Sequence, residues 1–409
     1  MTAPHSRTSN WRCVEYSYDN LPTELAQGVV ELCRGVFGEN EANMCADLFE
    51  KSPRRHLHRC FIALTQQKGE VVGCVHLLDV PFRYGDISLH TAELGIVATH
   101  PAFRNQGISQ ELTRNFQQRV REEHFELVEL EGIPHFYLRY GFHYAIPMRS
   151  TTATVPELAR DTQSSLQLRP VQPQDVGWIQ QLHHAQFHSI GGGRYFTPEI
   201  LHAKLFSFQA PDISLEGICT DSAYLLYQVK EDTLHVFDIS DGVSFAVFQQ
   251  LLRGVLEKEG TFQKVEAHVP AKYRFCRFLE GLGGKTEGSY AWQVWIPDLF
   301  AFFQKIKPML QTRLQQSWLA NESFSFHWNT YHERIRFDIR QGKIEVARLP
   351  FEVSWECNVP GPAAARILFG DFSTHDLQPF FPDLIVKKHV AQVLDVLFPK
   401  RTFSFFGGY

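Results

Sequence analysis

An apolar strand followed by an amphipathic helix is the clearest pattern of hydrophobic and polar positions in this chain. The run 94–97 predicts a buried strand, and Pro101 ends it because proline has no N–H for a sheet ladder. Beyond a short polar turn, apolar side chains recur every four positions and predict a helix with one apolar face, formed by Ile108, Leu112, Phe116 and Val120. The first N–H groups of a helix have no partner within it, so they point back at the turn and favour an anion there.

The turn itself contains residue types that suit a phosphate. The segment Arg104-Asn105-Gln106-Gly107-Ile108-Ser109 fits the pattern R-x-x-G-x-[G/A/S]. Gly107 allows the backbone to approach a ligand closely, and Arg104 adds a cation with forked geometry. We therefore expect a pyrophosphate to bind at this turn.

Similar patterns divide the chain into three units, of which the N-terminal unit spans residues 1–155. Its periodicity predicts helices at 21–37 and 41–51 and a hairpin formed by 60–64 and 70–78. It also predicts a strand at 126–131, after the helix described above. The C-terminal unit, residues 298–409, begins with an amphipathic helix at 298–315. Short antiparallel strands at 324–328, 334–339 and 343–348 follow, then helices at 362–369 and 389–397.

The middle unit, residues 156–297, repeats the order of the first one weakly, with a strand at 233–239, a helix at 243–258 and a strand at 264–269. At the position of the basic turn it has Ser240-Asp241-Gly242, and a carboxylate there repels a pyrophosphate. We therefore expect a degenerate copy without a cofactor. The glycine run 191–193 predicts a mobile loop over the cleft of the acceptor. The predicted fold class is α/β (α+β), with two tandem copies of one fold and a smaller α+β domain.

The composition supports a globular protein with several domains. The 409 residues are too many for one core, and 44% are hydrophobic while 21% are charged. No segment approaches the ~18 uncharged apolar residues of a membrane span, and residues 1–11 lack the apolar core of a signal peptide, so we expect a cytoplasmic protein. A net charge of −5 argues against nucleic acid as the main partner. The eight cysteines form no C-x-x-C pair and are expected to be reduced. Many of the 34 phenylalanines lie in the last third and suggest a deep apolar interior there.

The basic turn resembles the acyl-CoA-binding motif of the GNAT-type N-acetyltransferases. About 30 residues later, Phe136-Tyr137-Leu138-Arg139-Tyr140-Gly141-Phe142 matches the family's F-Y-x-[R/K]-x-G-[F/Y] segment. Ser109 departs from the usual Gly or Ala, but it is small. With a degenerate second copy and a tail that resembles a sterol-carrier-protein-like domain, the chain is similar to the enhanced intracellular survival (Eis-like) acetyltransferases.

This resemblance implies acetyl transfer from acetyl-CoA to an amine, without a metal. It implies Tyr137 as general acid and the C-terminal carboxylate of Tyr409 as base or orienting group. The residues that it implies for the cofactor are Val97, Ala98 and Thr99 for the pantetheine, Arg104, Asn105, Gln106, Gly107, Ile108, Ser109 and Gln110 for the pyrophosphate, and Gly132 and Ile133 beside the thioester. The resemblance also implies a homo-oligomer, such as a hexamer. The acceptor amine is not identified by the sequence.

Tyr137, Tyr409 and a group of three histidines have alternative interpretations. Tyr140 and Tyr144 are alternative candidates for the role of Tyr137, and the alternative for Tyr409 is a frayed terminus. His183, His184 and His188 lack an acidic partner in the spacing of a metal site, so we expect surface or packing roles.

The acidic residues and the enzyme class also have alternatives. Glu93, Glu129 and Glu131 could recruit a cationic amine or form a solvated face. The rival function is a carrier of a lipid or another hydrophobic ligand with a vestigial first domain, and a weaker rival is a CoA-sensing regulator. The intact basic turn favours the enzyme.

Overall fold

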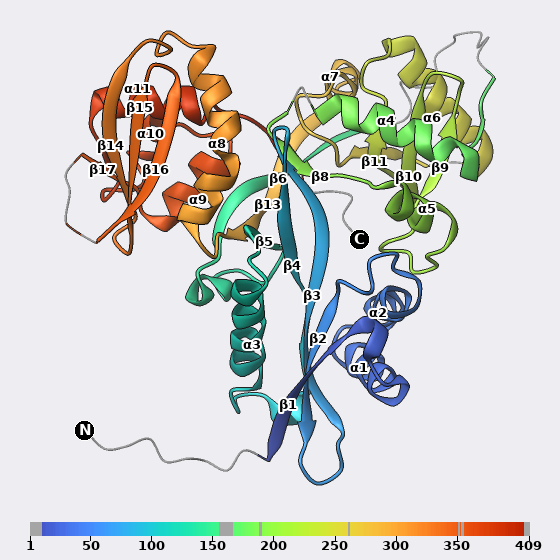
Figure 1. The fold of residues 1–409 in the computed structure, drawn as a ribbon. Helices are drawn as coiled ribbons and strands as arrows, with labels where there is room; N and C mark the ends of the chain where they lie inside the picture. The colour runs from blue at the N-terminus through green and yellow to red at the C-terminus, as the bar shows by residue number, and fades with distance from the viewer. Residues whose placement is uncertain are drawn as a thin grey trace.

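In the computed structural model, the described residues are 10–154, 167–187, 190–260, 262–350, 352 and 356–404. Among them, one sheet of 14 strands runs through the N-terminal and middle units, in the order β1-β2-β3-β4-β5-β13-β6-β12-β11-β10-β9-β7, with β8 and β19 beside this path (Figure 1). A separate five-stranded sheet belongs to the C-terminal unit. The predicted α/β (α+β) class is confirmed.

The N-terminal unit places helices on both faces of its strands (Figure 1). Its elements are β1 (Trp11–Ser17), α1 (Thr23–Val36), α2 (Glu39–Lys51), β2 (Arg59–Thr65), β3 (Val71–Tyr84), β4 (Ile87–Thr99), α3 (Ile108–Glu122) and β5 (Leu127–Leu130). Alternation along β2 explains the two faces. Cys60, Ile62 and Leu64 are buried against α1 and α2, whereas Phe61 and Ala63 are buried against α3.

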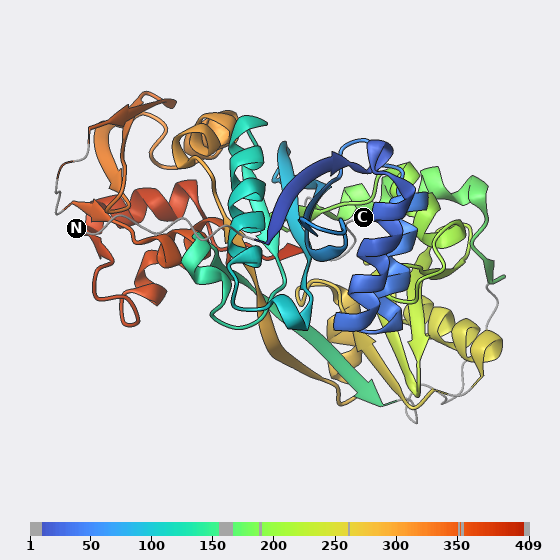
Figure 2. The same cartoon turned by 90° about the horizontal axis from the view of Figure 1, so that it is seen from below.

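The N-terminal and middle units exchange their last strands. β6 (His143–Thr154) pairs with β12 (Lys264–Ala267) of the middle unit, and β13 (Lys285–Trp295) lies between β5 and β6. Figure 2 shows β6 and β13 running side by side between the two units. The two sheets are therefore one continuous sheet, and β13 forms part of the N-terminal unit's central layer.

The remaining middle unit repeats the strand–helix–strand order of the first. Its elements are β7 (Arg169–Pro170), α4 (Val176–Gln186), α5 (Pro198–Phe206), β9 (Glu216–Cys219), β10 (Tyr224–Lys230), β11 (Thr233–Ile239), α6 (Phe245–Glu259), β12 and α7 (Arg274–Gly281). β11 and β12 are parallel, as β4 and β5 are. The core on the α6 side contains Leu234, Val236 and Val265.

The expected mobile loop at residues 191–193 is a wrong prediction. β8 (Gly192–Arg194) is a buried strand that pairs with β3 on one side and with β19 (Phe403–Ser404) on the other. A Cβ atom on Gly193 would lie 1.8 Å from the carbonyl oxygen of Ser404, and its φ is +146°. Glycine is needed here because two neighbouring backbones approach from both sides.

The C-terminal unit packs helices on its own sheet. Its elements are α8 (Leu299–Gln315), β14 (Ser323–Asn329), β15 (Arg334–Arg340), β16 (Lys343–Leu349), β17 (Cys357–Asn358), α9 (Gly361–Phe369), α10 (Thr374–Leu377), β18 (Ile385–Val386) and α11 (Lys388–Leu397). The phenylalanines are used for packing. The ring of Phe303 lies 5.3 Å from Trp328 and 5.0 Å from Phe337, centroid to centroid.

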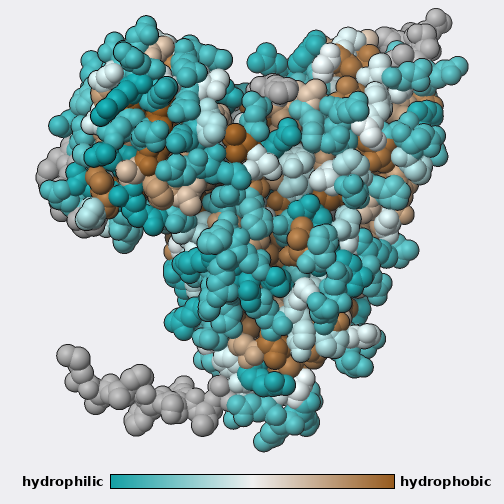
Figure 3. Space-filling model, viewed as in Figure 1, coloured by the Kyte–Doolittle hydropathy of each residue, from teal (hydrophilic) through white to brown (hydrophobic). Residues whose placement is uncertain are grey.

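The surface is mostly hydrophilic on the face drawn in Figure 3, where hydrophobic side chains form small, scattered patches. Within the described part of the chain, none of the helices is long and apolar enough to cross a membrane. All eight cysteines are free, and seven of them are buried.

Candidate active site

The site lies where two parallel strands separate. The β4–β5 ladder joins Thr91 to Leu127, Ala92 to Val128 and finally Glu93 to Glu129. Beyond this pair, β4 carries one extra residue between Leu94 and Val97 relative to β3, which forms a bulge. The following residues Val97, Ala98 and Thr99 pair with β3 on one edge only, so their other edge faces the opening, as far as the described residues show.

The basic turn is exposed and leads directly into α3. Asn105 and Gly107 both have positive φ, +63° and +82°, so the backbone turns sharply twice. The Glu111 N–H donates to the Gly107 carbonyl at 3.0 Å as the first helical bond. The N–H groups of Ile108, Ser109 and Gln110 therefore face the turn. A Cβ atom on Gly107 would meet no atom within 4 Å, which leaves space for a ligand close to the backbone.

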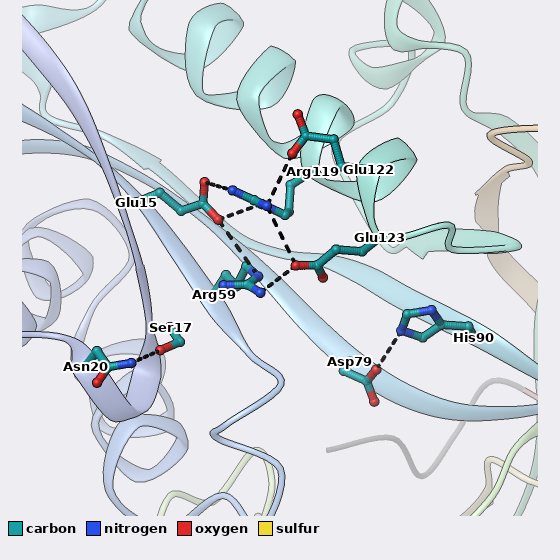
Figure 4. Close-up of polar contacts among 9 residues, drawn as sticks. All are labelled: Glu15, Ser17, Asn20, Arg59, Asp79, His90, Arg119, Glu122 and Glu123. Carbon is teal, nitrogen blue, oxygen red and sulfur yellow. Dashed lines mark hydrogen bonds and ion pairs between the residues drawn. The ribbon is translucent and has the colours of Figure 1, made fainter.

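An ion-pair network fixes α3 on the sheet (Figure 4). Arg119 on α3 binds both carboxylate oxygens of Glu15 on β1, at 2.9 and 3.1 Å. Arg119 also approaches Glu122 at 3.2 Å, and Arg59 on β2 pairs with Glu123. These charges join the C-terminal end of α3 to β1 and β2, whereas its apolar face, with Ile108, Leu112 and Phe116, packs in the core of the N-terminal unit.

Tyr137 lies at the carboxyl end of β5, in the short 3₁₀ helix η3 (Tyr137–Tyr140). Its side chain is 8% exposed, and its ring covers Gly132, where an added Cβ atom would lie 2.5 Å from the ring. Burial, together with the nearby Tyr140, raises the pKa of Tyr137 to about 12. The hydroxyl is therefore protonated at neutral pH.

Three side chains hold the loop that carries Gly132 and Ile133. The hydroxyl of Tyr290 on β13 donates to the Gly132 carbonyl, and the amide of Gln293 donates to the same oxygen at 3.5 Å. The His135 N–H donates to the hydroxyl of Tyr144 at 2.9 Å. Tyr144, considered as an alternative to Tyr137, thus has a partner in the loop backbone. Ile133 is 61% exposed.

The expectation of a solvated acidic face is wrong for Glu93 and Glu129. Both are buried, and Arg194 of β8 binds them at 2.6 and 2.7 Å, respectively. The Arg194 guanidinium also lies 4.6 Å from the ring centroid of Trp292. Glu131 is exposed. Arg194 was not predicted as a site residue, and its local signal in the sequence is its place directly after the glycine run.

Burial changes the proton affinity of this cluster. It raises the pKa of Glu129 to about 7, with Glu93 adding to the effect and Arg194 opposing it. The Oε2 atom of Glu129 is buried without a hydrogen-bond partner. Lys204, on α5, is buried near the same charges. Burial, and then the Arg194 charge, lowers the pKa of Lys204 to about 7. The end of the β4–β5 ladder therefore holds groups that change protonation near neutral pH.

The other candidates lie elsewhere or outside the described residues. In the middle unit, Asp241 accepts from the Phe275 N–H at 3.1 Å, so the equivalent of the basic turn binds the start of α7. His183 is buried and lies 2.8 Å from Asp238, whereas His188 lies outside the described residues. Tyr409 also lies outside them. The last described residue, Ser404, pairs with Gly193 of β8.

Comparisons with known proteins identify the fold of the N-terminal unit. The family model of the acetyltransferase (GNAT) domain matches residues 17–145. No curated protein matched the chain. A GCN5-related N-acetyltransferase from Anabaena variabilis ATCC 29413 is similar in structure, with 15% identity, a TM-score of 0.71 and coverage of 97% of this chain and 100% of the other.

Two further solved structures are similar over the same length. A GCN5-related N-acetyltransferase from Kribbella flavida has 13% identity, a TM-score of 0.70 and coverage of 97% and 100%. Eis1 from Mycobacterium abscessus has 14% identity, a TM-score of 0.61 and coverage of 97% and 99%. At these identities the likeness concerns the fold, whereas the family match concerns the N-terminal unit. Residues 17–145 therefore form a GNAT acetyltransferase domain, and the predicted enzyme class, an acetyl-CoA-dependent N-acetyltransferase, is supported.

Proposed function

We propose that this chain transfers an acetyl group from acetyl-CoA to an amine in the opening between β4 and β5. The observation that carries the proposal is the end of the β4–β5 ladder at Glu93 and Glu129. The N-terminus of α3 follows one strand, and Tyr137 follows the other. Since both strands are parallel, their carboxyl ends lie at the same edge of the sheet, with a phosphate-binding turn on one side and a proton donor on the other.

In this proposal, backbone groups make most of the contacts with acetyl-CoA. The N–H groups that precede Glu111 on α3, and the side chain of Arg104, would hold the pyrophosphate. The free edge of β4 would hydrogen-bond the pantetheine amides through Val97, Ala98 and Thr99. Gly132 and Ile133, on the loop held by Tyr290, would lie beside the thioester.

Tyr137 is proposed to stabilise the departing thiolate. Its pKa of about 12 exceeds that of an ordinary thiol, about 8.5, so complete proton transfer would cost about 5 kcal/mol. The neutral hydroxyl can donate a hydrogen bond throughout, and the proton moves late, when the thiolate charge is largest. The raised pKa therefore favours a role for the Tyr137 hydroxyl as a hydrogen-bond donor to the thiolate over early transfer of its proton.

The proton of the amine needs an acceptor. A free α-carboxylate has a pKa of about 3.5 and an alkyl ammonium about 10.4, so complete transfer to the predicted Tyr409 carboxylate would cost about 9 kcal/mol. Transfer to Glu129, with a pKa of about 7, would cost about 5 kcal/mol. We therefore assign the proton to Glu129 and the orientation of the amine to the Tyr409 carboxylate.

The finer predictions remain part of this proposal. They are the Eis-like type, the three units at 1–155, 156–297 and 298–409, the sterol-carrier-like character of the last unit, the cytoplasmic location and the homo-oligomer. The rival function, a carrier of hydrophobic ligands, has weaker support because the Phe303 cluster fills the C-terminal core with packed rings.

The experiment is acetyl-CoA turnover, followed by release of free thiol, against polyamines, aminoglycosides and peptide amines. Tyr137→Phe should lower kcat by about 100-fold or more. The matched control Tyr140→Phe, on the same 3₁₀ turn, should keep most of the activity. A variant with residues appended after Tyr409 tests the terminal carboxylate separately. Absence of turnover and of acetyl-CoA binding in the wild type would overturn the proposal.

A further inference from the structure

We propose that the middle unit binds a divalent transition-metal ion, zinc in the first place, through His235, Glu266 and His268. The three residues form a compact group on the β11–β12 surface, with ligand atoms that all lie within 4.8 Å of one another. The group is separate from the Tyr137 site and from the pair formed by His183 and Asp238. It is the one such group found among the described residues.

Strand pairing brings these side chains together. His235 on β11 is the direct partner of Glu266 on β12 in the parallel ladder. Glu266 and His268 are two positions apart, so they share one face of the sheet. The His268 N–H donates to the Val236 carbonyl at 2.8 Å, which continues the ladder to this residue. The opposite face, with Leu234 and Val265, is buried in the core.

The distances between ligand atoms suit a tetrahedral ion. The Nδ1 atom of His235 lies 3.0 Å from the Nε2 atom of His268, and carboxylate oxygens of Glu266 lie 3.5 Å from the first and 3.9 Å from the second. An ion bound at about 2.0–2.1 Å from each ligand atom separates them by about 3.3–3.5 Å. Adjustments of a few tenths of an ångström would therefore complete the site.

The surroundings favour zinc over magnesium or calcium. Two imidazoles and one carboxylate match the borderline preference of Zn²⁺, whereas the harder cations take oxygen ligands. Phe237 stacks on His268 with 5.1 Å between ring centroids and limits its rotation. The side chains of the three ligands are 19–27% exposed, so solvent and an ion can enter.

A hydrogen bond between the two imidazoles accounts for their approach without an ion, and calorimetry can separate the explanations. The full chain, stripped with a chelator, is titrated with Zn²⁺ and in parallel with Mg²⁺. The wild type should bind one more Zn²⁺ than Glu266→Gln or His235→Gln, or each variant should bind this ion more than 100-fold more weakly. This exceeds the loss of about 10–100-fold expected for an outer-shell partner.

The control variant is His184→Gln, which removes a histidine of the same unit outside the group and should bind Zn²⁺ as the wild type does. Because a variant could fail to fold, Co²⁺ is also added to the wild type. The intense visible absorption of tetrahedral Co²⁺ should appear and then disappear when Zn²⁺ is added. Equal Zn²⁺ binding by wild type and both variants, or absence of these Co²⁺ bands, would overturn the proposal.

Discussion

Glu129 is the direct partner of Glu93 in the last pair of the β4–β5 ladder, and both carboxylates are buried. Arg194 comes from β8, in the middle unit, and binds both of them. The centre of the proposed site therefore depends on two units of the chain. β8 also pairs with β19, so Phe403 and Ser404 lie opposite Gly192 and Gly193, the two residues directly before this arginine.

A Glu129→Gln variant tests the proton acceptor. The wild-type kcat/KM should rise with pH through an apparent pKa near 7, because the base must be ionised. In the variant we expect a fall of about 100-fold and loss of this acidic limb. The control is Glu131→Gln, two positions along and exposed, which should keep the profile. A uniform fall at all pH values would assign Glu129 a structural role instead.

The same variant should change the pH dependence of stability. The folded-state pKa of Glu129 is raised from 4.5 to about 7, so its contribution to stability is fully present below pH 4.5 and is lost as pH rises to about 7. The wild type should lose up to roughly 3 kcal/mol relative to Glu129→Gln over this range. Urea unfolding at pH 4.5 and pH 8 measures the difference. An equal difference at both values would contradict the raised pKa.

Arg104→Ala tests the pyrophosphate turn. Loss of a charge-assisted contact should raise the Kd for acetyl-CoA by about tenfold or more, and the effect should shrink at high salt. Arg114→Ala is the matched control, because Arg114 is exposed on the same helix and pairs with Glu111. Calorimetric titration with acetyl-CoA gives both values. Equal affinities of the two variants would remove Arg104 from the cofactor site.

Gly193→Ala tests the contact between β8 and the C-terminal segment. The new Cβ atom would meet the Ser404 carbonyl at 1.8 Å, so β19 must leave β8. We expect a loss of about 2 kcal/mol in stability and faster tryptic cleavage after Arg401. Gly242→Ala, where no atom lies within 4 Å of the new Cβ, should behave as the wild type. Unchanged cleavage in Gly193→Ala would show that this contact is not required.

Local patterns predict the elements whose side chains repeat within the element itself. The predicted strand 233–239 coincides with β11, and the predicted helix from Ile108 coincides with α3. β13 was not predicted, because its alternation is broken by register shifts at Gly288 and Trp292, and its partners β5 and β6 lie far earlier in the chain.

The candidate site could be predicted only as far as its chemistry is local. The basic turn and Tyr137 lie in short motifs, but the burial of Glu93 and Glu129 depends on Arg194, which is distant in sequence. For the same reason the glycine run was interpreted as a loop. Its backbone contacts with β3 and β19 exist only in the folded chain.

The central claim is that this chain moves an acetyl group from acetyl-CoA to an amine through the opening between β4 and β5. The most direct measurement is mass spectrometry of the amine after incubation with isotopically labelled acetyl-CoA. We predict an amine that carries the labelled acetyl group with the wild type, and about 100-fold less of it with Tyr137→Phe. Thiol release without a labelled amine, or equal labelling by wild type and Tyr137→Phe, would contradict this account.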